Sequence, residues 1–240
     1  MAKATLDSMF GISGRVAAVT GGGGVLCGTM AKVLADLGVK VALMDIRKEA
    51  AQAVVDEITS KGGTAVAVGC DVLKKESVQA AEAEVIKAFG KVDILINGAG
   101  GNHPKATTTD DIKFWDLPQD AFQWVFNLNF IGTVLPSQVF GKTFAAQDAG
   151  DIINISSMSA FRPLTKVAAY SAAKAAISNF TQWLAVHISQ NYSTKIKVNA
   201  IAPGFFITEQ NRYLLTDKET GGLTPRGQKV IDHTPMGIFG

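Results

Sequence analysis

Three side chains in the second half of the chain carry groups that can move a proton. Ser157 precedes Tyr170 by 13 residues, and Lys174 follows Tyr170 by four. Residues four apart share one face of a helix, so the Lys174 ammonium is expected beside the Tyr170 phenol, where its charge lowers the phenol's pKa. The pattern predicts a tyrosine that exchanges a proton with a substrate oxygen held by Ser157. Because a tyrosine and a lysine at this spacing are common by chance, a buried tyrosine beside a surface lysine is the alternative.

A glycine-rich turn near the N-terminus has the composition of a phosphate-binding loop. An apolar run at 15–19 leads into Thr20-Gly21-Gly22-Gly23-Gly24, and a helical pattern follows. Glycines let backbone N–H groups approach a pyrophosphate at a helix N-terminus, where the helix dipole favours an anion. An ordinary tight turn would use the same residues. The contacts expected with a dinucleotide come from Gly21, Gly24, Val25 and Leu26.

An acid follows the second apolar run at the spacing expected for a ribose contact. Asp45 lies 24 residues after Gly21, where a carboxylate can accept a hydrogen bond from the ribose 2′-hydroxyl. The same carboxylate would repel a 2′-phosphate, so the expected cofactor is NAD(H) in preference to NADP(H). Arg47 is the cation near enough to accommodate such a phosphate.

Two further strand ends supply candidate cofactor contacts. Asp71 and Val72 follow the third run, where Asp71 would meet an adenine edge or, with equal weight, cap the helix expected near Lys75. The fourth run ends in Asn97-Gly98-Ala99-Gly100, whose small residues let the backbone lie against a flat ligand or simply make a turn. Asn97, Ala99 and Gly100 are the expected contacts.

Alternation of apolar runs with helical patterns predicts an α/β fold. The runs are nearly continuous in apolar residues, as in parallel strands covered on both faces. We expect a single domain over residues 1–240, with one Rossmann-like, doubly wound parallel sheet and helices on both faces. The expected strands lie at 15–19, 39–44, 64–68, 92–96, 151–155 and 195–200, and the expected helices at about 26–37, 48–60, 75–89, 118–147 and 168–190.

Two stretches interrupt this alternation, one over 101–116 and one over 205–240. Both follow strands of the expected sheet. Loops at the carboxyl ends of parallel strands form the ligand crevice of open α/β sheets, so we expect both stretches to be substrate loops. Surface insertions without function are the alternative.

Bulk composition bounds the function further. With 240 residues, 47% of them hydrophobic and 18% charged, the chain can bury a large core. The net charge is +2, and the lysines and arginines are spread along the chain without a basic block, so nucleic-acid and membrane partners are not expected. Without an apolar segment typical of a signal peptide or a membrane span, a cytoplasmic location is expected. Cys27 and Cys70 are predicted to be packing residues, and the histidine spacing predicts no metal site.

Together these motifs resemble the classical short-chain dehydrogenase/reductase family over essentially the whole chain. The catalytic tetrad of that family is similar to Asn129, Ser157, Tyr170 and Lys174. The resemblance implies that Asn129 holds a water for proton relay to Lys174. It also implies that Tyr170 gives a proton to a substrate carbonyl while a hydride arrives from the nicotinamide, with Tyr170 and Lys174 contacting the cofactor.

The later part of the chain adds to the resemblance. Pro203-Gly204 is similar to a Pro-Gly element of the family, which implies that Thr208 meets the nicotinamide carboxamide. The family also implies a homo-oligomer, a dimer or tetramer, that packs the central helices between subunits. Family members usually continue beyond a segment like the one ending at Gly240, so the expectation is either a sequence that is cut short or a protein without the usual last strand.

The glycine turn departs from the family pattern, because Val25 and Cys27 stand at two glycine positions and Gly98 replaces a usual asparagine. This variant turn, with Asn211-Arg212-Tyr213-Leu214-Leu215 and His233-Thr234-Pro235-Met236-Gly237, resembles a subgroup of D-mannonate oxidoreductases, also called fructuronate reductases. The resemblance implies exchange of D-mannonate and NAD with D-fructuronate and NADH.

A sugar-acid substrate needs a partner for its carboxylate. Arg212 is the first candidate because a guanidinium can bind a carboxylate through two hydrogen bonds. Asn102, His103 and Lys105 are further candidates in the other long stretch, and each of the four is equally well explained as a solvated loop residue. The alternatives in function are another polyol or keto-acid dehydrogenase, such as a gluconate 5-dehydrogenase, and a dinucleotide-binding regulator without turnover.

Overall fold

The computed structural model describes residues 11–162, 164–208 and 211–240. The chain forms two compact units, Met1–Ile201 and Ala202–Gly240. All six strands of the sheet belong to the first unit. The expectation of a single domain stays a prediction.

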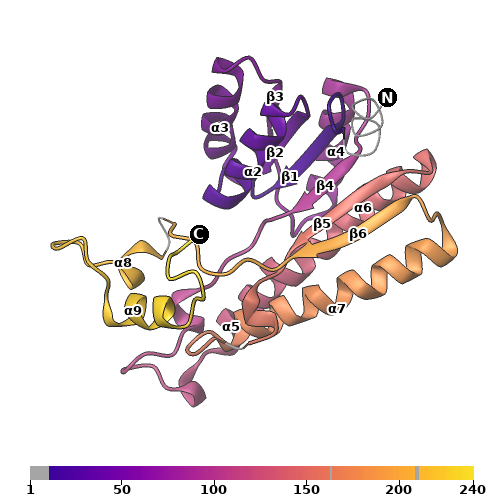
Figure 1. Cartoon of the computed structure of the whole chain (residues 1–240). Helices are drawn as coiled ribbons and strands as arrows, with labels where there is room; N and C mark the ends of the chain where they lie inside the picture. The colour runs from indigo at the N-terminus through magenta and orange to yellow at the C-terminus, as the bar shows by residue number, and fades with distance from the viewer. Residues whose placement is uncertain (1–10, 163, 209–210) are drawn as a thin grey trace. The chain divides into compact units, whose positions relative to one another are not determined.

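The first unit contains one parallel sheet with the strand order β3-β2-β1-β4-β5-β6 (Figure 1). The strands are β1 (Val16–Thr20), β2 (Lys40–Asp45), β3 (Ala65–Gly69), β4 (Ile94–Asn97), β5 (Gly150–Ile155) and β6 (Ile196–Ile201). The order changes direction between β1 and β4, whose last residues, Thr20 and Asn97, pair with each other. Ligands of open α/β sheets bind at this place, outside the carboxyl ends of the strands.

Helices cover the sheet on two faces, so the predicted Rossmann-like fold is confirmed. On one face, α2 (Val25–Asp36) and α3 (Lys48–Ser60) pack over Val19 and Leu43. On the other face, α4 (Lys75–Phe89), α6 (Gly132–Gln147) and α7 (Ala168–Asn191) pack over Ala18 and Leu95. Successive strand residues point to opposite faces, and burying each large apolar side chain stabilises the fold by roughly 1.5–3 kcal/mol.

Strand β6 differs from the expectation that every strand is covered on both faces. Ile196 and Val198 are buried in the cluster that contains α7, whereas Lys197, Asn199 and Ile201 are exposed. The physical reason is position, because β6 is an edge strand and the core cluster of the opposite face contains residues of β1 to β5 and none of β6.

The helix expected over 118–147 is divided. It consists of α5 (Gln119–Phe126), a wider π-helical turn η3 (Asn127–Ile131) and α6. Asn129 is fully buried within this turn. Such turns are frequent at functional sites because they re-aim one side chain without ending the helix.

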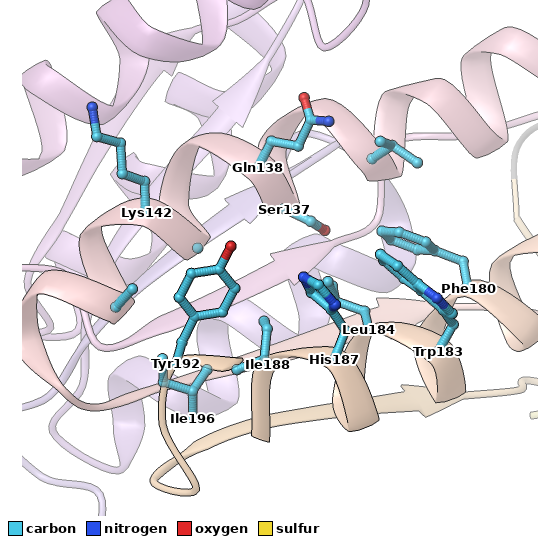
Figure 2. Close-up of a pocket in the computed structure, with 13 residues that line it drawn as sticks. Ser137, Gln138, Lys142, Phe180, Trp183, Leu184, His187, Ile188, Tyr192 and Ile196 are labelled. Carbon is cyan, nitrogen blue, oxygen red and sulfur yellow. The ribbon is translucent and has the colours of Figure 1, made fainter. Parts of the chain in front are cut away.

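A groove with a volume of about 400 Å³ runs between α6 and α7 (Figure 2). Aromatic rings from the outer part of α7 line it. Phe180 stacks on Trp183 at a centroid distance of 6.3 Å, and Trp183 stacks on His187 at 4.8 Å. Trp183 and Tyr192 remain 57% and 63% exposed, so this groove leaves a large apolar surface in contact with solvent.

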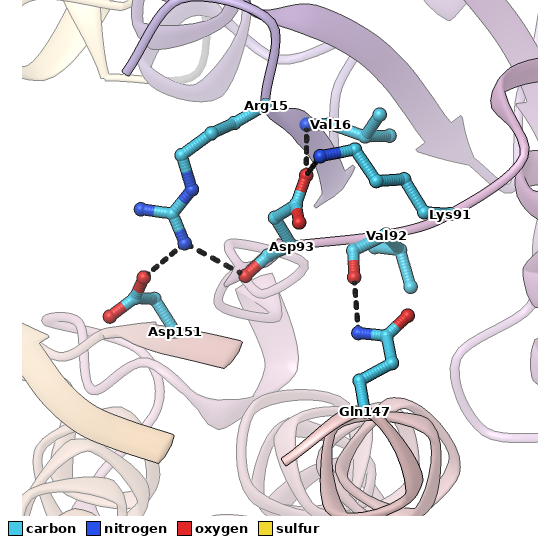
Figure 3. Close-up of polar contacts among 7 residues, drawn as sticks. All are labelled: Arg15, Val16, Lys91, Val92, Asp93, Gln147 and Asp151. Carbon is cyan, nitrogen blue, oxygen red and sulfur yellow. Dashed lines mark hydrogen bonds and ion pairs between the residues drawn. The ribbon is translucent and has the colours of Figure 1, made fainter. Parts of the chain in front are cut away.

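A polar network joins the amino ends of three neighbouring strands (Figure 3). Arg15 pairs with the carboxylate of Asp151 and donates to the main-chain carbonyl of Asp93 at 3.3 Å. The Asp93 carboxylate accepts from the N–H of Val16 at 2.8 Å and pairs with Lys91 at 2.9 Å. These residues lie at the end of the strands away from the glycine turn, so the network is structural.

Within residues 202–208 and 211–240, the second unit contains two short helices, α8 (Arg212–Leu215) and α9 (Pro225–Asp232). The expectation of a loop over 205–240 is wrong at these residues. The start of α9 is capped by Thr224, whose Oγ1 accepts from the N–H of Gly227 at 3.0 Å, and Pro225 takes the first helical position. Both are recognised helix-start signals that the sequence contains.

Among the residues that the structure describes, no helix is long and apolar enough to cross a membrane. Across the same ranges, no three His, Cys, Asp or Glu side chains gather as a metal site.

Candidate active site

Three of the predicted catalytic residues meet at the carboxyl edge of the sheet. Tyr170 and Lys174 lie on α7, and Ser157 follows β5 at the start of the short helix η4 (Met158–Ala160). Ser157 lies close enough to the Tyr170 phenol to lower its pKa, and Lys174 Nζ lies 5.5 Å from the centre of the Tyr170 ring. Tyr170 thus lies beside a hydroxyl and a cation, and the catalytic roles of the three residues stay predictions.

Asn129 joins this group through the backbone that follows β4. Its Nδ2 donates to the carbonyl oxygen of Gly101 at 2.7 Å, and its Oδ1 accepts from the N–H of Gly101 at 3.2 Å. A Cβ at Gly100 would lie 2.6 Å from Asn129 Oδ1 and 3.4 Å from Lys174 Nζ. Both side chains therefore lie against Gly100, which leaves no room for a larger residue.

The Lys174 ammonium is held inside the protein. Lys174 is 4% exposed, and its Nζ donates to the carbonyl oxygen of Ile155 at 2.7 Å. Burial lowers the pKa of Lys174 from 10.5 to about 8. The group is thus mainly charged at pH 7 and loses its proton in mildly alkaline solution.

The Tyr170 phenol has a raised pKa, which differs from the expectation. Burial raises the pKa of Tyr170, and the hydrogen bond from Ser157 only partly opposes this effect. Desolvation of the phenolate is the larger effect, and Lys174 is not among the groups that lower this pKa. A lowering by Lys174 together with an oxidised nicotinamide ring stays a prediction. At neutral pH Tyr170 is protonated and suited to donate a proton.

The turn between β1 and α2 has the geometry of an anion site. Gly21 adopts a left-handed conformation with φ of +65°, and a Cβ there would lie 3.0 Å from the backbone of Ala99. Helix α2 begins at Val25 without a side-chain hydrogen bond at its N-cap, Gly24, and without an acid in its first turn. Its first N–H groups are thus suited to a pyrophosphate.

Asp45 is attached to this turn from the end of β2. Its Oδ2 accepts from the N–H of Gly23 at 3.1 Å, and its Oδ1 accepts from the N–H of Arg47 at 2.9 Å. The carboxylate thus lies beside the glycine turn with acceptor capacity to spare. Arg47, which could have accommodated a phosphate, contacts Asp45 through its backbone.

Comparison with known proteins decides the family. The sequence profile of the short chain dehydrogenase family matches residues 15–219. The chain belongs to the short-chain dehydrogenase family. This match confirms the family and the type of enzyme, a dehydrogenase/reductase, expected from the motifs.

Individual relatives are similar over most of their length. An uncharacterized oxidoreductase, UxuB, of Bacillus subtilis is 51% identical over 237 residues, which are 95% of this chain and 84% of that protein. An NAD-dependent glycerol dehydrogenase of Listeria innocua is 35% identical over 234 residues, 98% of this chain and 84% of that one. The crystal structure of a Haemophilus influenzae protein with bound NAD, provisionally named a D-mannonate oxidoreductase, matches with a TM-score of 0.89 and 46% identity, covering 98% and 86% of the two chains.

Within this short-chain dehydrogenase, Asp71 binds its own turn. Its Oδ1 accepts from the N–H of Leu73 at 3.0 Å, and its carboxylate pairs with Lys74 at 3.3 Å. The N-cap of α4 is Lys74, so the interpretation of Asp71 as that cap is wrong. Val72 is buried in the core against Gly132. A contact of either residue with a cofactor stays a prediction.

Asn97 belongs to a buried polar network. Its Nδ2 donates to Ser137 Oγ and to Asn154 Oδ1, both at 2.9 Å. Asn97 therefore ties β4 to β5 and α6, and its predicted contact with a cofactor stays untested.

Sequence reasoning missed the role of Thr20. Its Oγ1 accepts from the N–H groups of Gly98 and Ala99 at 3.0 and 3.1 Å. This side chain therefore fixes the segment after β4 beside the glycine turn. The sequence signal that could have predicted this role is the threonine at the last position of β1, where a hydroxyl can accept hydrogen bonds from a neighbouring strand end.

The candidate substrate residues of the 101–116 stretch contact that stretch itself. Asn102 Nδ2 donates to Thr107 Oγ1 at 2.8 Å. His103 Nδ1 accepts from the N–H of Lys105 at 3.1 Å, and its ring packs edge-on against Trp124 at a centroid distance of 5.2 Å. Asn102 and His103 thus stabilise the turn η1 (Pro104–Ala106), whereas Lys105 is exposed.

The remaining candidates belong to the second unit. Arg212 opens α8 with its side chain exposed, and its N–H donates to the carbonyl oxygen of Thr208 at 2.9 Å. Roles for Pro203, Gly204, Thr208 and Arg212 in ligand binding stay predictions.

Both cysteines are packing residues, as predicted. Cys27 and Cys70 are 3% and 4% exposed and belong to the two core clusters. Burial raises the pKa of each thiol to about 11, so neither is a reactive thiolate at neutral pH.

Proposed function

We propose that this chain is an NAD(H)-dependent oxidoreductase that interconverts D-mannonate and D-fructuronate. The observation that carries the proposal is the buried group of Ser157, Tyr170 and Lys174. A phenol, a hydroxyl and a cation at one point can bind a carbonyl oxygen and give it a proton. Similarity to the Haemophilus influenzae protein supports the choice of substrate.

The residues around the glycine turn fit a dinucleotide. The uncapped start of α2 would hold the pyrophosphate, and Asp45 would accept hydrogen bonds from the adenosine ribose. A Cβ at Gly21 would lie against the backbone of Ala99, and a Cβ at Gly100 would lie against Asn129, so both glycines leave room that a side chain would fill. When bound, the nicotinamide supplies a hydride to the ketone or accepts one from the alcohol.

The protein's own groups then manage the proton. In the direction of reduction, Ser157 donates a hydrogen bond to the substrate carbonyl oxygen, and protonated Tyr170 gives that oxygen its proton. Lys174 stabilises the negative charge that develops on the phenol, and its bond to Ile155 fixes the ammonium in place. Asn129, held against Gly101, would keep the water through which Lys174 regains contact with solvent.

NAD(H) is proposed over NADP(H). Asp45 has both carboxylate oxygens directed at backbone N–H groups beside the glycine turn, so a 2′-phosphate would face a fixed negative charge. The Listeria innocua relative, named NAD-dependent, supports the same choice.

Another polyol or keto-acid dehydrogenase, such as a gluconate 5-dehydrogenase, is the second candidate. Similarity to the glycerol dehydrogenase favours it, because loops set the substrate in this fold while the catalytic group stays the same. Loss of NADH absorbance with fructuronate, 5-ketogluconate and neutral ketoses separates the two. The leading proposal fails if fructuronate is not preferred.

A homo-oligomer, a dimer or tetramer, is also proposed. The groove between α6 and α7 exposes Trp183 and Tyr192 beside Phe180, a composition typical of subunit interfaces (Figure 2). A cytoplasmic location stays a prediction from the sequence.

A further inference from the structure

The segment Gly98–Gly101, called here the cofactor strip, connects two parts of the site. At one end, its N–H groups at Gly98 and Ala99 donate to Thr20 Oγ1 beside the glycine turn. At the other end, Gly101 exchanges two hydrogen bonds with Asn129. A displacement of this strip would therefore disturb the hydrogen bonds to Thr20 at the glycine turn and to Asn129 at the catalytic group.

Cys27, on α2, contacts the cofactor strip at Gly98, which has no side chain. A Cβ built on Gly98 would lie 2.0 Å from Cys27 Sγ, which is far too close for two non-bonded atoms. The same Cβ would lie 3.6 Å from Cys27 Cβ, which is ordinary contact. The severe conflict thus comes from the sulfur atom, which occupies the space of a side chain at position 98, and the Thr20 carbonyl oxygen at 3.0 Å adds a second close contact.

The thiol has little freedom to move aside. Cys27 is 3% exposed and packs in the cluster that α2 forms with the sheet. In a closely packed interior, changing the volume by one methyl group is felt by the neighbours. The two unusual residues of this chain, a cysteine at 27 and a glycine at 98, are therefore complementary in shape.

We propose that Cys27 is a positioning residue for the cofactor strip, acting through Gly98. Its Sγ sets the distance between α2 and the strip, and so the place of the backbone that the nicotinamide half of the cofactor meets. The inference rests on the proposed binding of NAD(H).

A double-mutant cycle on NADH affinity tests this coupling. Gly98→Ala places a methyl group against Cys27 Sγ and is expected to weaken NADH binding about tenfold. Cys27→Ala leaves a gap and is expected to weaken it about threefold. The double variant removes the conflict with the sulfur and keeps only the close contact with the Thr20 carbonyl oxygen, so its dissociation constant is expected to return to within about threefold of wild type.

Matched controls separate positioning from loss of fold. Cys27→Ser keeps an atom at the Sγ position and should bind NADH like wild type. Cys70→Ala removes the other buried thiol, and Gly69→Ala adds a methyl group where its nearest neighbour is 3.9 Å away. Both should leave NADH affinity unchanged. Thermal unfolding of every variant is recorded beside NADH fluorescence titration.

The outcomes decide between the hypotheses. Recovery of NADH affinity in the double variant supports the proposal, and additive losses overturn it. Coupling seen in the unfolding temperature but not in NADH affinity makes the pair merely structural and also overturns it. If Gly98→Ala does not fold, the single variant Cys27→Ala decides, because unchanged NADH affinity there would refute the role. A wild-type protein without NADH affinity would instead refute the proposed function.

Discussion

Lys174 Nζ donates a 2.7 Å hydrogen bond to the carbonyl oxygen of Ile155, the last residue of β5. This bond ties the ammonium on α7 to the strand that leads directly into Ser157. The cation and the hydroxyl beside Tyr170 are thus both attached to the carboxyl end of β5. Buried donors of this kind are costly to leave without a partner, which makes the arrangement rigid.

Replacing Tyr170 with Phe should abolish turnover and spare the cofactor. The phenol is the proposed proton donor, so its loss is expected to lower kcat by about 10²–10⁴-fold. NADH affinity should change little because the ring remains. Steady-state NADH oxidation and fluorescence titration measure the two effects. Normal turnover in this variant would remove Tyr170 from the mechanism.

The pH dependence should follow the Lys174 ammonium. Burial lowers its pKa from 10.5 to about 8, so the cation that supports proton donation is lost as the pH rises through 8. We therefore expect kcat for ketone reduction to fall above pH about 8. A profile that stays flat to pH 10 would contradict this assignment.

The buried Lys174 ammonium should lower the free energy of unfolding at neutral pH. Between pH 8 and 10.5 the unfolded chain binds this proton and the folded chain does not, so stability rises with pH over that window. Below pH 8 the cost of the buried charge is present in full. Lys174→Met, which is similar in length, is therefore expected to raise stability at pH 7 by about 1–2 kcal/mol, after the lost bond to Ile155 is subtracted.

Urea unfolding of wild type and Lys174→Met at several pH values measures this difference. The gain should shrink as the pH approaches 10, while activity stays lost throughout. A variant less stable than wild type at pH 7 would show that the hydrogen bond to Ile155 outweighs the cost of burying the charge.

Much of this site could be predicted because local spacing fixes it. Tyr170 and Lys174 share a helix face, and Ser157 follows the end of a strand, so the fold brings them to the same edge of the sheet. The raised pKa of Tyr170 was not predictable, because it depends on how completely the surrounding elements exclude water. The π-helical turn at Asn129 could not be predicted either, because an unbroken helix over residues 118–147 would show the same apolar pattern.

Asp45→Ala should relax the choice of cofactor. Loss of a charged acceptor at the ribose is expected to weaken NADH binding about 10- to 100-fold, while NADPH binding improves because the repulsion is removed. The ratio of kcat/KM values for the two cofactors measures this change. Asp56→Ala, an exposed acid on α3, is the matched control. An unchanged ratio would mean that another residue contacts the ribose.

Arg212→Ala should affect acidic substrates selectively. If its guanidinium binds the substrate carboxylate, KM for keto-sugar acids should rise about 10- to 100-fold, with KM for neutral ketoses unchanged. Arg226→Ala, an arginine of the same unit, is the control. Equal KM values for the acids in wild type and Arg212→Ala would exclude this residue as the anchor.

Trp183→Asp should reduce the size of the assembly. Trp183 is 57% exposed at the mouth of the groove between α6 and α7, and a carboxylate there would have to be desolvated when a second copy covers it. Light scattering should give a smaller species for this variant than for wild type. Trp115→Asp alters an even more exposed tryptophan, outside the groove, and should leave the mass unchanged. If Trp183 lies in the subunit interface, the variant must bury an unpaired carboxylate there, and the free-energy cost should weaken the association of the subunits. A Trp183→Asp variant with the wild-type mass would therefore show that the subunit interface lies elsewhere.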